Sequence, residues 1–283
     1  MKSELLVSTE QLAAHLADPD WIVVDVRHDL VDPRKGPAAY AAGHIPGAYF
    51  LHVDDDLAGF KDGTNGRHPL PPLDLFALRM NARGVAPGRM VVAYDERGGM
   101  FASRLWWMLR WLGHERAALL DGGFAAWLRE ERPVDTEVPA PREGRFVPRP
   151  QLGATVDVHY VAAFRESPTV RLIDARAPER FSGAQEPIDP VAGHIPGAVN
   201  RFCQQNLAPD GRFKPASQLR AEFLELLGDA TPNLTVHQCG SGVAACHNIL
   251  AMELAGIHGS RLYPGSWSEW CADPARPIAT DTR

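Results

Sequence analysis

The chain has 283 residues, of which 45% are hydrophobic and 23% charged, a composition typical of soluble globular proteins. Its length corresponds to roughly two domains and is enough to bury a large core without disulfide or metal staples. It carries 29 basic and 35 acidic residues and so lacks the basic excess of nucleic-acid-binding proteins. We find neither a transmembrane run nor the apolar core of a signal peptide. With only four cysteines, we expect a reducing, cytoplasmic location and free thiols.

Short apolar segments alternate with helical patterns in the first half of the chain. Residues 22–26 and 90–94 are continuous apolar runs, typical of strands buried on both faces. Residues 101–112 have helical spacing and are followed by Gly113, a common helix stop. This alternation predicts an α/β fold in which a parallel β-sheet is covered by helices on both faces.

A proline-rich stretch and a second series of such elements follow. Residues 133–152 contain five prolines and no hydrophobic periodicity, which predicts an extended linker. The linker separates an N-terminal domain, 1–132, from a C-terminal domain, 153–283. In the second domain we expect strands at 170–174 and 234–238, and helices at 217–227 and 243–254.

The two halves repeat each other. Gly-His-Ile-Pro-Gly-Ala occurs at 43–48 and again, unchanged, at 193–198. Gly-Gly-Phe-Ala-Ala-Trp at 122–127 is matched by Gly-Ser-Trp-Ser-Glu-Trp at 265–270. Ordered matches along the whole length indicate two tandem copies of one domain.

The copies differ where a central strand ends. The first copy has Asp95 there, whereas the second has Cys239, followed by Gly240, Ser241 and Gly242. Ligands of open α/β sheets bind outside the carboxyl ends of strands. The glycines allow successive N–H groups to point inward, and the following helix adds its positive end. Both effects favour a thiolate and would stabilise a further anionic sulfur on Cys239.

The repeated His-Ile-Pro-Gly-Ala segments, the Cys-Gly-Ser-Gly-Val loop at 239–243 and the Trp-Ser-Glu-Trp segment resemble those of two-domain rhodanese-type sulfurtransferases. Within that family the loop is most similar to that of 3-mercaptopyruvate sulfurtransferases. The resemblance implies two rhodanese-like domains, of which the N-terminal one is catalytically silent. It also implies that Cys239 takes sulfur from 3-mercaptopyruvate as a persulfide and passes it to a thiol, such as thioredoxin, or to cyanide. No metal or organic cofactor is implied.

The resemblance also implies roles for other residues. Arg180 matches the arginine that binds the anionic end of the donor, and a guanidinium suits a carboxylate. Ser241 is expected to contact the substrate or relay a proton, and His44 to reach that serine. The remaining residues expected to bind the substrate form the loop around the cysteine: Gly240, Gly242, Val243 and Ala244.

Three positions depart from the family pattern. Ile188 stands where many mercaptopyruvate enzymes have a second arginine, and Ala244 stands where a threonine is usual. Cys246, seven residues after the reactive cysteine, is expected to be a buried helix residue, although it is close enough in sequence to resolve an oxidised Cys239. These departures bear on the choice of donor more than on the persulfide chemistry.

Several alternatives are weighed against this interpretation. Thiosulfate is the alternative donor, and a non-enzymatic persulfide carrier or regulatory module would use the same cysteine. A cysteine phosphatase needs an arginine six residues after its nucleophile, where this chain has Ala245. A zinc site built from Cys239, Cys246, His247 and Cys271 would have irregular ligand spacing, so we expect no metal there.

Overall fold

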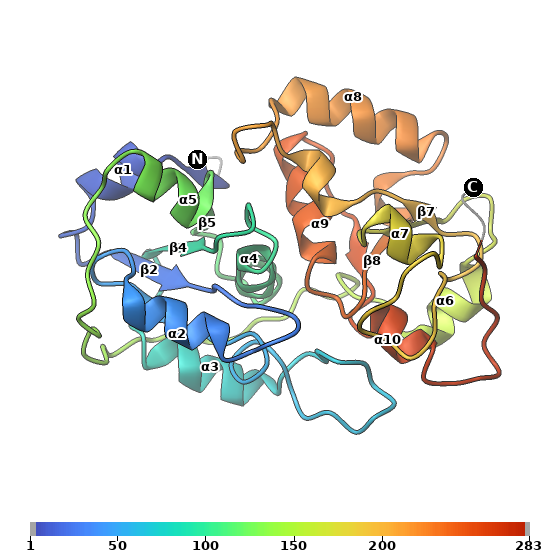
Figure 1. Ribbon diagram of the computed structural model, residues 1–283, viewed down its shortest axis with the longest axis horizontal. Coiled ribbons are helices and arrows are strands. Elements are labelled where there is room, and N and C mark those ends of the chain that lie inside the picture. The colour runs from blue at the N-terminus through green and yellow to red at the C-terminus, as the bar shows by residue number, and fades with distance from the viewer. Residues whose placement is uncertain (1–3, 281–283) are drawn as a thin grey trace. The chain divides into compact units, whose positions relative to one another are not determined.

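The computed structural model describes residues 4–280, which form two compact units (Figure 1). The first unit comprises the chain up to residue 59 together with 70–151 and 207–213. The second comprises 60–69, 152–206 and the chain from 214 onward. No helix among residues 4–280 is long and apolar enough to cross a membrane.

The first unit is built on a five-stranded parallel sheet with the strand order β1-β5-β4-β2-β3. Its strands are β1 (Leu6–Val7), β2 (Trp21–Asp25), β3 (Tyr49–Phe50), β4 (Met90–Tyr94) and β5 (Ala117–Leu120). Its helices are α1 (Thr9–Ala14), α2 (Lys35–Ala42), α3 (Leu73–Asn81), α4 (Ala102–Trp111) and α5 (Gly123–Arg129). Every residue of β4 is buried, as its unbroken apolar run predicts.

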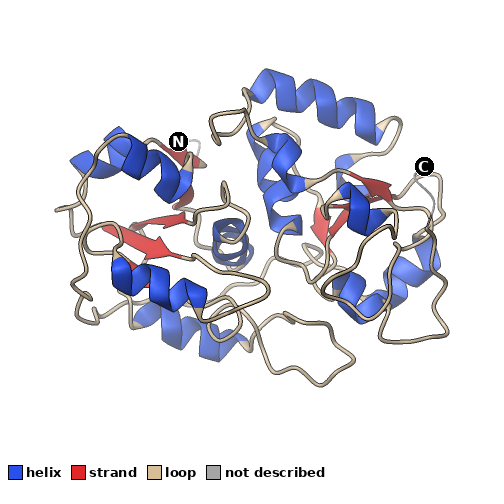
Figure 2. Ribbon diagram, viewed as in Figure 1, coloured by secondary structure: helices blue, strands red, loops and turns tan. Residues whose placement is uncertain are grey.

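The second unit repeats this plan with four parallel strands in the order β7-β6-β8-β9. Figure 2 shows the helices and strands by colour. Its strands are β6 (Arg171–Asp174), β7 (Val199–Asn200), β8 (Thr235–Gln238) and β9 (Arg261–Leu262). Its α-helices are α6 (Val158–Phe164), α7 (Pro178–Phe181), α8 (Ala216–Leu227), α9 (Ala245–Leu254) and α10 (Ser266–Trp270), and its 3-10 turns are Cys203–Asn206 and Pro232–Leu234. The expected parallel α/β architecture is confirmed, although α9 begins two residues later than its pattern predicts.

A buried ion pair recurs at the end of β2 in the first copy and of β6 in the second. Arg27 binds the Asp25 carboxylate at 2.6 Å and the Gly43 carbonyl at 2.7 Å. In the second unit Arg176 binds Asp174 at 2.7 Å and the Gly193 carbonyl at 2.8 Å. Each pair ties its strand to the glycine that opens the repeated His-Ile-Pro-Gly-Ala turn, so these arginines serve the fold in both copies.

Each unit also contains a short segment from the opposite half of the sequence. Residues 60–69 pack in the second unit, where the Arg67 N–H donates to Ser268 Oγ at 3.0 Å. Residues 207–213 pack in the first, where the Phe213 N–H donates to Asp121 Oδ1 at 2.9 Å. Their sequences, Gly-Arg-His and Gly-Arg-Phe, are themselves counterparts in the repeat.

Residues 133–151 lie on the first unit without helix or strand. Asp135 forms an antiparallel bridge with His44, and Arg142 a parallel bridge with Arg83. The stretch therefore runs along the unit through isolated backbone contacts, while the domain limits at 132 and 153 stay predictions.

Candidate active site at Cys239

Cys239 is the first residue after β8 and is buried. Its N–H donates to Ser266 Oγ at 3.2 Å, and its carbonyl accepts from the Trp267 N–H at 3.0 Å. Both contacts come from the start of α10. The strand and this helix together therefore fix the backbone that carries the thiol.

The loop after Cys239 curls around the sulfur. The Ser241 N–H points at Cys239 Sγ at 3.5 Å. Gly242 has a φ of +76°, and a Cβ there would lie 2.4 Å from the Pro264 carbonyl oxygen, so the turn requires glycine. Val243 is buried and Ala244 is partly exposed as the chain enters α9. Of the loop residues singled out in the sequence, Ser241 thus contacts the sulfur through its N–H, and the substrate-binding role of the others stays a prediction.

Arg180, in α7, lies beside this loop. Arg180 donates hydrogen bonds to Glu186 from Nη2 at 2.7 Å and from Nε at 3.1 Å. Its Nη2 also donates to Asp189 at 3.0 Å. A Cβ on Gly240 would lie 3.4 Å from Nη2 and 3.5 Å from Nη1. The two carboxylates therefore hold the guanidinium against the residue next to the cysteine, where a side chain larger than glycine would crowd it.

Arg67, which our sequence analysis missed, brings a second guanidinium to the same place. Its Nη1 pairs with Asp189, and its Nη2 would lie 2.8 Å from a Cβ on Gly240. Burial lowers the pKa of Arg67, and Arg180 lowers it further, whereas Cys239 acts in the opposite direction. Two cationic groups thus share Asp189 beside Cys239. Ile188, at the expected position of a second arginine, donates only its N–H to Glu186, at 3.1 Å.

His68 is the histidine that contacts the loop serine. Its Nδ1 lies 2.6 Å from Ser241 Oγ, and both residues are buried. In the structure His68 makes this contact with Ser241, whereas the expectation that His44 reaches that serine stays a prediction. His68 follows Arg67, so one short segment supplies both groups to the second unit.

His44 has a local role that its counterpart repeats. His44 Nδ1 lies 2.8 Å from the Tyr40 carbonyl oxygen, and the two rings stack at 3.9 Å. In the second unit, His194 Nδ1 lies 2.8 Å from the Phe181 carbonyl oxygen, and those rings stack at 3.8 Å. The same contact in both copies indicates that this histidine anchors the repeated turn.

One signal in the sequence distinguishes the two histidines. His44 is duplicated as His194, whereas the counterpart of His68 is Phe213. The same asymmetry separates Cys239 from Asp95. Applied to histidines, the comparison that singled out the cysteine would also have singled out His68.

All four cysteines lie in the described part of the chain, and none forms a disulfide. Cys246 is buried in the first turn of α9, with its Sγ 3.4 Å from the Gly242 carbonyl oxygen. Burial raises the pKa of Cys271, although Arg67 and Arg176 oppose the shift. Among the cysteines, only Cys239 occupies the end of a central strand within a glycine loop.

Comparison with known families gives the same division of the chain into two copies. The model of the Rhodanese-like domain matches residues 8–130 and again 157–273. A probable 3-mercaptopyruvate sulfurtransferase of Pseudomonas aeruginosa is 46% identical, with 99% of each chain covered. A putative thiosulfate sulfurtransferase of Mycobacterium tuberculosis is 36% identical over 99% of each chain.

A solved structure has the same fold. The crystal structure of SseA from Escherichia coli, described as a 3-mercaptopyruvate sulfotransferase with the rhodanese fold, superposes with a TM-score of 0.80. It is 31% identical, and the alignment covers 94% of this chain and 99% of that one. The likeness thus extends over both copies.

Proposed function

The chain belongs to the rhodanese-like family, and from that premise we propose that it is a sulfurtransferase that moves sulfur from 3-mercaptopyruvate to a thiol or cyanide through a Cys239 persulfide. One observation carries the proposal: Cys239 lies in a glycine loop with two guanidinium groups close to Gly240, and the loop residue Ser241 is hydrogen-bonded to His68. This arrangement combines a nucleophile, an anion site and a proton relay.

The guanidinium groups define the kind of donor. Arg180 Nε and Nη2 are bound to carboxylates, which leaves Nη1, 3.5 Å from the position of a Cβ on Gly240, for a ligand. Arg67 approaches Gly240 from its own segment. A small anion in front of the loop would therefore meet positive charge from two guanidinium groups, which suits the carboxylate of 3-mercaptopyruvate.

Sulfur transfer to the enzyme then balances without a cofactor. The Cys239 thiolate attacks the donor sulfur, so an S–S bond forms as the C–S bond breaks. The electron pair of the broken bond passes to the carbon, giving the enolate of pyruvate. The proton of the donor thiol moves to that carbon, pyruvate leaves, and the persulfide anion stays on Cys239.

Ser241 and His68 form the relay that we assign to this proton. The 2.6 Å contact joins the hydroxyl to the ring, so a proton taken from the donor thiol can be held by His68 and returned through Ser241. General acid–base groups of this kind contribute about 10²–10⁴-fold to rate.

The first unit supports the proposed stabilisation of the persulfide. Asp95 takes the place of Cys239, and its carboxylate accepts N–H bonds of 2.7–2.9 Å from four residues of the following loop and the start of α4. The donors are Arg97, Gly99, Phe101 and Ala102. A carboxylate oxygen is two bonds from Cβ, as is the outer sulfur of a persulfide. The loop architecture therefore suits an anion at that distance.

In the second half-reaction, an acceptor thiolate attacks the outer sulfur. The Cys239 thiolate leaves, and the acceptor carries the sulfur away as its own persulfide. With cyanide the product is thiocyanate. We expect a thiol acceptor such as thioredoxin, and the two half-reactions predict ping-pong kinetics.

The test compares kcat/KM for 3-mercaptopyruvate and thiosulfate, and mass spectrometry follows Cys239. We expect a gain of about 32 Da, one sulfur atom, after mixing with 3-mercaptopyruvate, a higher kcat/KM for that donor, and neither signal in Cys239→Ser. A higher kcat/KM for thiosulfate would assign the alternative donor, which the name of the mycobacterial relative favours. A single loading event without repeated release of pyruvate would make the protein a carrier and overturn the proposal.

A further inference from the structure

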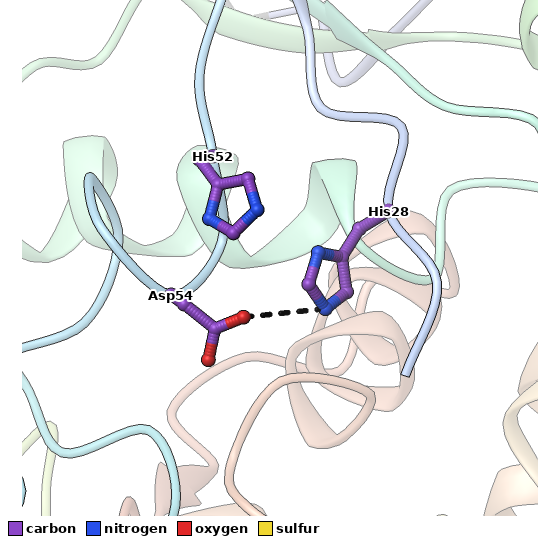
Figure 3. A group of neighbouring side chains, drawn as sticks. All are labelled: His28, His52 and Asp54. Carbon is purple, nitrogen blue, oxygen red and sulfur yellow. Dashed lines mark ion pairs between the residues drawn. The ribbon is translucent and has the colours of Figure 1, made fainter. Parts of the chain in front are cut away.

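The first unit holds a cluster of metal-ligand side chains outside the Cys239 site. One donor atom from each of His28, His52 and Asp54 lies within 4.8 Å of the other two (Figure 3). His28 Nε2 is 3.7 Å from Asp54 Oδ2. His28 follows β2 and the other two follow β3, so the cluster occupies the carboxyl edge of the sheet, where α/β folds bind ligands.

The three side chains of the cluster are mostly buried. The His28 side chain is 2% exposed, His52 12% and Asp54 20%. The His28 ring packs edge-on against the rings of His52, at 5.3 Å, and Phe101, at 5.1 Å. The two imidazoles are therefore largely removed from water, and the carboxylate is the most exposed of the three groups.

His52 and Asp54 lie in a turn that is closed by two hydrogen bonds between His52 and Asp56. The His52 N–H donates to Asp56 Oδ2 at 2.8 Å, and the Asp56 N–H donates to the His52 carbonyl at 2.8 Å. Asp56 also faces Arg79, at 3.5 Å, and Arg83, at 3.7 Å. Asp56 is thus committed to the turn and to arginines, and the carboxylate that lies with both histidines is that of Asp54.

The surroundings of His52 point to a cation. Its Nε2 lies 3.1 Å from the Pro33 carbonyl oxygen, which can only accept, so Nε2 carries the ring proton. In the neutral ring Nδ1 then holds a lone pair, yet it is buried and lies 3.3 Å from Asp55 Oδ2. A lone pair facing a carboxylate oxygen needs a proton or a metal ion between them. A backbone carbonyl on the other ring nitrogen is also the usual outer support of a histidine ligand.

We propose that His28, His52 and Asp54 bind a divalent first-row metal ion of the Zn²⁺ type. Two imidazoles and one carboxylate are a donor set that zinc accepts with a water in its fourth position. The ion would clip the loop after β2 to the loop after β3. This site shares no residue with the cysteine-based zinc set considered from the sequence.

Zn²⁺ alone is the probe, titrated by calorimetry into the full chain carrying Cys239→Ser, which removes the competing thiolate. We expect one equivalent of Zn²⁺ to bind and Co²⁺ to give an absorption band displaced by Zn²⁺. His28→Gln, His52→Gln and Asp54→Asn should each weaken binding at least about tenfold. The matched control is His258→Gln, which alters an exposed histidine 2.6 Å from Glu253 and should bind as the parent does.

Asp54→Asn keeps the test decisive if a histidine variant fails to fold, because Asp54 is part-exposed and Asn has nearly the same shape. The metal-free urea midpoint of each variant checks folding. No binding to the parent, or equal binding by the parent and a folded Asp54→Asn variant, would overturn the proposal. In that case a proton on His52 would account for its contact with Asp55.

Discussion

Arg67 and Arg180 reach Gly240 from different segments and share Asp189. Each guanidinium is therefore expected to make its own contact with the carboxylate of the sulfur donor. We expect Arg67→Ala and Arg180→Ala each to lower kcat/KM for 3-mercaptopyruvate. The loss of one charge-assisted contact of about 1.5–3 kcal/mol corresponds to roughly 10–150-fold. Steady-state kinetics measures this, and the loss should appear mainly in KM. An unchanged kcat/KM in Arg67→Ala would remove that residue from the anion site.

His68 and His44 form a second test at the residue scale. His68→Gln should lower kcat by about 10²-fold or more, because it removes the partner of Ser241. His44→Gln should leave kcat close to that of the parent, because the contacts of His44 are made with Tyr40 and Glu137 in its own unit. Urea unfolding of both variants separates lost chemistry from lost structure. Equal kcat values for the two variants would contradict the assignment of His68.

The loops after β4 and β8 differ in what their N–H groups hold. In the first unit four N–H groups converge on the buried Asp95 carboxylate; burial raises the pKa of Asp95, and these hydrogen bonds oppose that shift. Asp95→Ala would leave those donors without their acceptor and should cost about 3 kcal/mol or more of unfolding free energy. Cys239→Ala removes one weak acceptor and should cost less. Urea unfolding of the two variants compares them, and equal losses would refute the role given to Asp95.

Elements differ in how well they can be predicted from sequence. The buried strands β2 and β4 coincide with continuous apolar runs, from which the sequence predicts them. The strands β1, β3, β7 and β9 have two residues each, too short for any periodicity, and exist because a neighbouring strand supplies their partners. Cys239 was found through the difference between the copies, whereas Arg67 and His68 were missed because their segment packs in the unit formed mainly by the other half.

At the scale of the whole molecule, each unit contains a buried histidine whose pKa is lowered by burial. Burial lowers the pKa of His114 in the first unit, although its backbone hydrogen bonds oppose the shift. In the second unit, burial lowers the pKa of His237, on β8, from 6.5 to about 3. His237 Nε2 lies 3.1 Å from Met252 Sδ. The folded chain therefore keeps His237 neutral at pH values where the unfolded chain would protonate it.

The sign of the pH effect follows from that difference. Below pH 6.5 His237 is protonated in the unfolded state but stays neutral in the folded state. The free energy of unfolding therefore falls as the pH drops from 6.5 toward 3. At pH 5 the protonation of His237 in the unfolded state lowers the free energy of unfolding by about 2 kcal/mol. His237→Gln should flatten the dependence of unfolding free energy on pH in this window, even if it lowers stability at pH 7. Parallel curves for parent and variant between pH 7 and pH 4.5, measured by urea unfolding, would show that His237 is not the group responsible.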